Sequence, residues 1–85
     1  MPGVLSLANI AMLVDEGGQI TVGALRPIPC VAVANNEHDT VAMLRRRPEE
    51  SVLQLLERLD QAIATVAATG RRIDEINPAP PSRKR

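Results

Sequence analysis

Hydrophobic side chains recur at steps of three and four residues between positions 52 and 66, the clearest periodicity in the chain. At 100° per residue they fall within one stripe roughly 100° wide, as on an amphipathic helix. The stripe consists of Val52, Leu55, Leu56, Leu59, Ile63 and Val66. Pro48 suits a first helical turn, because its missing N–H costs nothing there, and Gly70 is a natural stop. The pattern predicts a helix over residues 48–69.

Part of this stripe alternates steps of four and three residues, the spacing of a seam between paired helices. Because only about two heptads are present, the stripe can also be interpreted as one face of a globular core within a single chain. The chain has 85 residues and no aromatic ring, and a lone core of that size is marginal. We therefore expect a second copy to cover the stripe. The predicted dimer-interface residues are Val41, Leu44, Val52, Leu55, Leu56, Leu59, Ile63 and Val66.

Residues 19–25 alternate polar or small side chains with apolar ones, which is the period of a strand with one buried face. Pro27 and Pro29 interrupt the pattern, since neither can donate to a strand ladder. Residues 30–34 form a short apolar, β-branched run and are a candidate second strand. The two runs would form a loose hairpin.

The segment 35–47 is ambiguous. Asn36 is a good N-cap, two acidic residues would lie in the first turn, and the three arginines at 45–47 would lie at the C-terminal end of a helix. The alternative places a turn at Asn36 and a strand over 40–44 that pairs back on residues 30–34. We favour the helix.

The sequence divides the chain into a folded middle part and two terminal segments. We expect residues 1–18 to form an N-terminal arm, either flexible or ordered, 19–69 a folded dimerisation and DNA-binding domain, and 70–85 a disordered, basic, Pro-rich tail. The apolar run 4–14 has no basic residue before it and is too short to span a bilayer. Cys30 is the single cysteine, which fits a reduced compartment. The sequence predicts a cytoplasmic protein.

Ten basic and ten acidic residues give a net charge of zero, but they are segregated. Basic islands at 45–47 and 71–85 flank a largely acidic helix. Such islands neutralise phosphates in nucleic-acid-binding proteins. A solvated cluster at a helix end is the alternative interpretation.

Candidate catalytic chemistry is sparse. The chain has one His and one Cys, without the CxxC or HExxH spacing of metal sites, and no phosphate-binding GxxxxGK loop. His38 lies between two acidic residues, and we interpret it as an exposed residue of a helix's first turn. Glu57 and Asp60 lack an apolar pocket that would make one of them an acid. We expect no enzymatic activity, no metal and no cofactor.

The favoured order of elements is one strand, one short helix and one long helix. This order resembles the ribbon-helix-helix proteins, small dimeric bacterial repressors and antitoxins. The likeness lies in the alternating strand 19–23, the Asn36-capped segment with Val41 and Leu44, and the helix that starts at Pro48. It implies a mainly α fold with a short β element, a β-α-α homodimer with a disordered C-terminal tail. A strand from each subunit would form a ribbon in the DNA major groove.

The resemblance also implies which residues contact DNA. Gln19 and Thr21 would face base edges, where amides and hydroxyls read donors and acceptors. Arginines would contact phosphates, and Ser51 would do so with backbone amides at the start of the second helix. The predicted DNA-binding residues are Gln19, Thr21, Arg26, Arg45, Arg46, Arg47 and Ser51.

The expected function is therefore a small dimeric DNA-binding protein, a transcriptional repressor or an antitoxin of a toxin–antitoxin pair. Its tail would bind a toxin or another protein. The alternative is a non-enzymatic helical dimerisation or adaptor module that binds another protein through the long helix or the tail. The acidic outer face of residues 49–60 favours this alternative.

Overall fold

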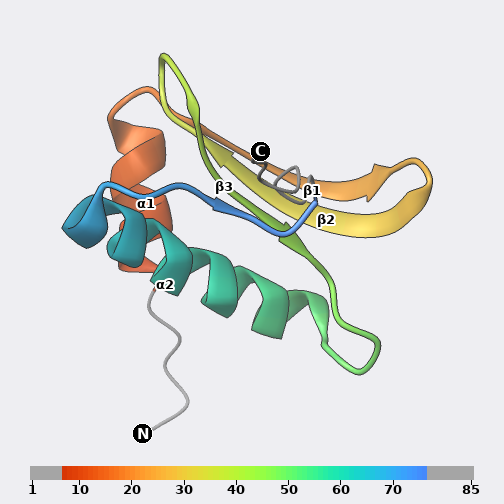
Figure 1. Cartoon of the computed structure of the whole chain (residues 1–85). Helices are drawn as coiled ribbons and strands as arrows, with labels where there is room; N and C mark the ends of the chain where they lie inside the picture. The colour runs from red at the N-terminus through yellow and green to blue at the C-terminus, as the bar shows by residue number, and fades with distance from the viewer. Residues whose placement is uncertain (1–6, 77–85) are drawn as a thin grey trace, which may run out of the picture.

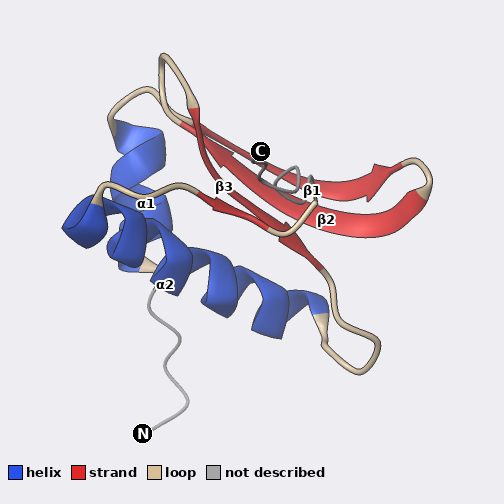
Figure 2. Cartoon of the chain, in the orientation of Figure 1, coloured by secondary structure: helices blue, strands red, loops and turns tan. Residues whose placement is uncertain are grey.

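The computed structural model describes residues 7–76. Its elements follow one another along the chain as two helices and four strands (Figure 1). They are α1 (Ala8–Asp15), β1 (Gln19–Leu25), β2 (Ile28–Asn35), β3 (Thr40–Arg45), α2 (Val52–Thr69) and β4 (Ile73–Asp74). Both helices lie on the same side of the sheet, where α2 packs on β2 and β3 and α1 packs on α2 (Figure 2).

The sheet has the strand order β1-β2-β3-β4. The first three strands are antiparallel neighbours, with Ala32 of β2 paired to Val22 on one side and to Leu44 on the other. The short β4 runs parallel to β3. The protein is thus an α/β fold with a mixed four-stranded sheet, and the predicted mainly α, β-α-α ribbon-helix-helix arrangement is wrong.

The error arose in the segment after β2. Asn36 does not cap a helix; its Oδ1 accepts hydrogen bonds from the backbone N–H groups of His38 (2.7 Å) and Asp39 (2.6 Å). This turn reverses the chain into β3, whose β-branched start suits a strand. The alternative that the sequence left open, a strand pairing back on the preceding one, is the observed structure.

The other expected strands are present. The strand predicted over residues 19–25 has those bounds in β1, and the candidate strand at 30–34 is extended to Ile28 and Asn35 in β2. Pro29 is accommodated because the β1–β2 register shifts between Gly23 and Leu25. The two strands form a hairpin.

The long helix begins four residues later than predicted, at Val52. Ser51 is its N-cap: the Ser51 Oγ accepts from the Gln54 N–H (3.0 Å), and the Gln54 Oε1 accepts from the Ser51 N–H (2.8 Å). This reciprocal capping box satisfies two N–H groups that otherwise lack partners. Gly70, at φ 73°, ends the helix in the left-handed conformation, as predicted.

The core lies between α2 and the helix-facing side of the sheet. Ala32, Ala34 and Ala42 of the strands are fully buried against Leu55 and Leu59 of α2. These small side chains let the helix approach the sheet closely, so the same chain covers much of its apolar stripe. Of the predicted dimer-interface residues, Leu44, Leu55, Leu59 and Ile63 are buried, Val41, Leu56 and Val66 are half-buried, and Val52 is exposed.

The segment that the sequence predicted as an N-terminal arm contains α1. Asp60 of α2 is only 4% exposed, and its carboxylate accepts hydrogen bonds from the Ile10 N–H (2.9 Å) and from Asn9 Nδ2 (3.0 Å). A carboxylate at the first turn of a helix satisfies free N–H groups there. Asp60 therefore fastens α1 to α2.

The tail predicted to be disordered from residue 70 includes β4, so that prediction is wrong for residues 73–74, and residues 77–85 lie outside the described part of the chain. Within residues 7–76, no helix is both long and apolar enough to cross a membrane.

Candidate nucleic-acid interface

Four exposed arginines gather at one end of the sheet; we call them the arginine surface. They are Arg26 in the β1–β2 turn, Arg45 at the end of β3, and Arg46 and Arg47 in the loop that follows. Arg26 and Arg45 line one surface depression, and Arg45, Arg46 and Arg47 line an adjoining one. Ile28 contributes to both depressions.

Strand pairing brings these arginines together. Leu25 pairs with Ile28 across the hairpin turn, so Arg26 lies beside the start of β2. Arg45 pairs with Val31, and the Arg46 N–H donates to the Cys30 carbonyl (3.1 Å), so the end of β3 lies against the same part of β2. The arrangement therefore follows from the sheet register.

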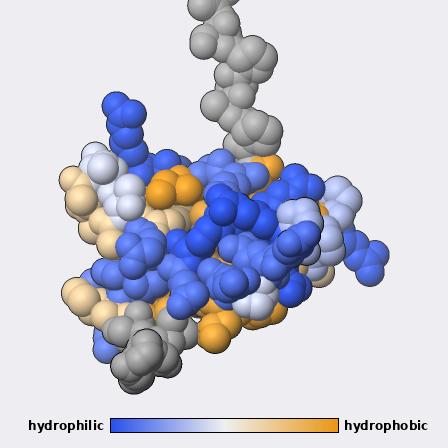
Figure 3. Space-filling view, turned by 90° about the horizontal axis from the view of Figure 1, so that it is seen from below, coloured by the Kyte–Doolittle hydropathy of each residue, from blue (hydrophilic) through white to orange (hydrophobic). Residues whose placement is uncertain are grey.

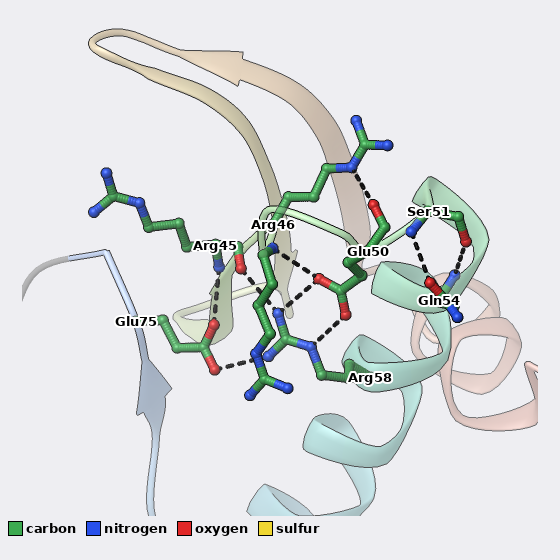
Figure 4. Close-up of polar contacts among 8 residues, drawn as sticks. Arg45, Arg46, Glu50, Ser51, Gln54, Arg58 and Glu75 are labelled. Carbon is green, nitrogen blue, oxygen red and sulfur yellow. Dashed lines mark hydrogen bonds and ion pairs between the residues drawn. The ribbon is translucent and has the colours of Figure 1, made fainter.

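Two of the acidic groups next to the arginine surface, Glu50 and Glu75, are held by one further arginine, Arg58 of α2. The exposed Glu49 and Glu57 line a depression with Arg47 and are not bound by Arg58. The guanidinium of Arg58 binds both carboxylate oxygens of Glu50, with Nε–Oε2 at 2.7 Å and Nη2–Oε1 at 3.0 Å (Figure 4). It also donates to Glu75 Oε2 (2.8 Å) and to the Arg45 carbonyl (2.8 Å). Arg58 thereby joins α2, the end of β3 and the segment after β4. We call Glu50, Arg58 and Glu75 the Arg58 cluster.

The cluster keeps Glu50 ionised. The hydrogen bond from Arg58 is the main cause that lowers the pKa of Glu50 from 4.5 to about 2, against an opposing effect of burial, and the Arg47 N–H adds to the lowering. Hydrogen bonding to Glu50 in turn raises the pKa of Arg58 above its ordinary value. Both carboxylates of the cluster are thus already partnered.

Among the described residues, no carboxylate forms an ion pair with the arginine surface, although the charge of Arg47 contributes to the lowered pKa of Glu50. Arg46 Nε donates to the Glu50 backbone carbonyl (2.7 Å), a contact that leaves its charge uncompensated. The Arg45 backbone N–H donates to Glu75 Oε1 (3.0 Å), while the Arg45 guanidinium points away from the Arg58 cluster (Figure 4). This end of the sheet therefore presents available positive charge to a ligand.

The other predicted DNA-contact residues are not part of this surface. Ser51 uses its hydroxyl to cap α2. Gln19 and Thr21 belong to the first half of β1, away from the Arg26 turn. Because Ile20 packs on the core and side chains alternate along a strand, Gln19 and Thr21 point to the sheet face that the helices leave uncovered. Arg45, which follows the buried Leu44, points to that face as well.

Sequence reasoning missed the Arg58 cluster. It placed Glu50 in the first turn of the helix, where the structure has it before the helix, with its carboxylate on Arg58. The available signal was Arg58 itself, since it is the one basic residue between positions 48 and 69. A lone Arg among carboxylates suggests a pairing role.

The remaining candidates for chemistry are separated in the structure. Glu57 is exposed on the outer side of α2, whereas Asp60 is buried and fastens α1. His38 lies exposed in the β2–β3 turn. Among residues 7–76 no group of three or more His, Cys, Asp or Glu side chains is placed to hold a metal ion.

Comparison with known proteins adds no assignment: no family model, no curated protein and no solved structure matches this chain.

Proposed function

We propose that this protein binds duplex DNA through the arginine surface. The observation that carries the proposal is the set of four exposed arginines that form no ion pair within the described residues, beside two carboxylates that both bind Arg58. Guanidinium groups match phosphate oxygens in charge and geometry. A chain without aromatic rings lacks the stacking platforms that bind single strands, which favours a duplex.

Phosphate contacts position a protein on DNA and do not read sequence. Gln19 and Thr21 share the uncovered sheet face with Arg45 and are the polar side chains that we propose for contacts beyond the phosphates. The major-groove ribbon implied by the family resemblance is not part of the proposal, since the fold is not the β-α-α arrangement of that family. A non-enzymatic regulatory role as repressor or antitoxin, in the cytoplasm, remains the role we propose.

Fluorescence anisotropy with a short labelled duplex tests the proposal across about 50 to 200 mM salt. If all four arginines contact phosphates, log K falls against log salt with a slope of about −3.6, since each contact contributes about −0.9. The double variant Arg45→Ala, Arg47→Ala should bind more weakly, with a slope near −1.8. Neither guanidinium donates a hydrogen bond or forms an ion pair among the described residues, so the fold should be retained.

The matched control is the double variant Arg71→Ala, Arg72→Ala, which removes the same charge away from the arginine surface. Arg72 is exposed and makes one long ion pair with Asp39 (3.8 Å). This control should keep the wild-type slope. Absence of binding by the wild-type protein, or an equal loss in both double variants, would show that the arginine surface is not the DNA site.

A protein-binding adaptor is the second candidate function. Val52 and Leu53 at the start of α2 are 42% and 53% exposed, and Glu49 and Glu57 lie nearby in the sequence. The face seen in Figure 3 is largely hydrophilic, with hydrophobic residues in separate small areas. An adaptor predicts no DNA binding in the anisotropy experiment, so the same measurement separates the two candidates.

A further inference from the structure

The outer edge of β1 is open within the described part of the chain. β1 is the first strand in the sheet order and pairs there with β2 alone. An edge strand offers a row of free N–H and C=O groups to another strand. The opposite edge is the two-residue β4, which is too short to offer a comparable row.

β1 lacks the usual protection of an edge. Natural edge strands are commonly blocked by charged side chains, prolines or short length. β1 has seven residues, Gln-Ile-Thr-Val-Gly-Ala-Leu, with neither a charge nor a proline among them. Val22 at its centre is 40% exposed, and Leu25 at its end is 45% exposed. The edge is thus apolar and free of electrostatic repulsion.

The sequence of β1 is also complementary to itself. In an antiparallel pair centred on Val22, Ile20 lies opposite the partner's Ala24, and Thr21 lies opposite the partner's Gly23. In these two pairs a larger side chain faces a small one, the central Val22 faces its own copy, and only the end pair, Gln19 with the partner's Leu25, joins two large side chains. Since the strand carries no charge, no like charges meet, and like charges directly opposite are destabilising.

We propose that β1 pairs antiparallel with β1 of a second copy of this chain, about a two-fold axis at Val22, to form a continuous eight-stranded sheet. A two-fold interface uses the same surface on both copies, which the self-complementary strand supplies. The proposal is independent of DNA binding. It would place the two Arg26 residues about 26 Å apart along the strands, from eight residue steps of about 3.3 Å.

Sedimentation equilibrium of the full chain tests the association. The wild-type protein should show twice the chain mass of 9.2 kDa. Val22→Lys places two ammonium groups opposite each other and should raise the dimer dissociation constant by about tenfold or more. Leu53→Lys is the matched control, because Leu53 is similarly exposed but lies on α2, and it should remain dimeric. A monomeric wild-type protein, or a Val22→Lys variant as dimeric as the control, would overturn the proposal.

Cysteine cross-linking tests the register. In a Cys30→Ala background, Val22→Cys should form an intermolecular disulfide on mild oxidation, because directly opposed Cβ atoms lie about 4.5–5.5 Å apart. Leu53→Cys in the same background is the control and should stay largely uncross-linked. Equal cross-linking of the two variants would show that Val22 does not face its own copy and would refute the proposed register.

Discussion

Replacing Glu50 with Gln tests how much the negative charge of Glu50 in the Arg58 cluster contributes to the stability of the fold. The amide keeps the size of the side chain and can still accept hydrogen bonds, so the change removes the negative charge while preserving the packing. The Glu50 side chain is 8% exposed and is held by Arg58 at 2.7 Å. We expect Glu50→Gln to destabilise the fold, because Arg58 then has only Glu75 as a charged partner.

The magnitude follows from the pKa of Glu50, which falls from 4.5 to about 2 on folding. At about 1.4 kcal/mol for each pKa unit, this sets an upper bound of about 3.4 kcal/mol. Solvent reaches Arg58 and Glu75 and screens part of the interaction, so we expect a loss of about 2 kcal/mol at pH 7. This loss is large for a protein of 85 residues.

The loss should depend on pH in one direction. A carboxylate whose pKa is depressed in the folded state stabilises that state fully above the unfolded pKa, and the stabilisation disappears as pH falls through the folded pKa. The difference between wild type and Glu50→Gln should therefore be constant above about pH 5.5 and shrink to less than about 0.5 kcal/mol at pH 2. Groups that titrate equally in both proteins cancel.

Urea unfolding followed by far-UV circular dichroism measures this difference, since the chain has no Trp or Tyr for intrinsic fluorescence. Both proteins are compared at one concentration, because self-association would add to apparent stability. Glu57→Gln is the control: Glu57 is exposed on the same helix without a recorded ion pair, and its change should cost less than about 0.5 kcal/mol. A loss of stability in Glu50→Gln equal to that of the control, or one that does not vary between pH 7 and pH 2, would show that the charge of Glu50 does not stabilise the fold.

Two further variants test how the helices are held. Asp60→Ala should lower the free energy of unfolding by about 2–4 kcal/mol, because it removes the buried acceptor of two hydrogen bonds. It should also selectively speed hydrogen exchange of the Ile10 amide, and unchanged exchange would contradict the role of Asp60 in docking α1. Leu59→Ala should lower the free energy of unfolding in urea by about 2–5 kcal/mol, because Leu59 is fully buried between α2 and the sheet. Leu53→Ala is the exposed control and should change it by less than about 0.5 kcal/mol. Similar values for the two variants would contradict the packing of α2 on the sheet.

The sequence predicts the elements whose signals are local. The period of two over residues 19–25 correctly gives β1, and the apolar stripe with Gly70 correctly gives most of α2. The start of α2 was misplaced because Pro48 and Ser51 are both acceptable at a helix N-terminus, and only Ser51 has Gln54 three residues later to complete a capping box.

Residues 36–45 were predicted to be a helix because the residues at both ends of the segment are typical of helix ends. Asn36 followed by acidic residues and, later, three arginines is the charge order of a capped helix, yet Asn36 stabilises a turn equally well. The small size of Ala32, Ala34 and Ala42 lets α2 pack closely on the sheet, and nothing in the local sequence indicated that packing. Because the sheet that covers α2 was not predicted, the apolar stripe of α2 was expected to pack against a partner subunit.

The candidate site was predictable in part. Arg26 and the arginines at 45–47 were expected to contact phosphates from their type alone, and the sheet register brings them together. Their lack of carboxylate partners depends on Arg58 reaching Glu50 and Glu75, residues 8 and 17 positions away. Contacts of that kind follow from the tertiary fold and have no local sequence signature.

DNA binding at the arginine surface is tested most directly by a heteronuclear NMR titration of the labelled protein with a short DNA duplex at low and moderate salt. Binding at the arginine surface predicts that the amide signals of Arg26, Ile28 and residues 45–47 shift, and that added salt reverses these shifts. The signals of Arg71 and Arg72 should stay in place. Unchanged signals at the arginine surface under low salt, or shifts centred on the exposed start of α2 instead, would contradict the account.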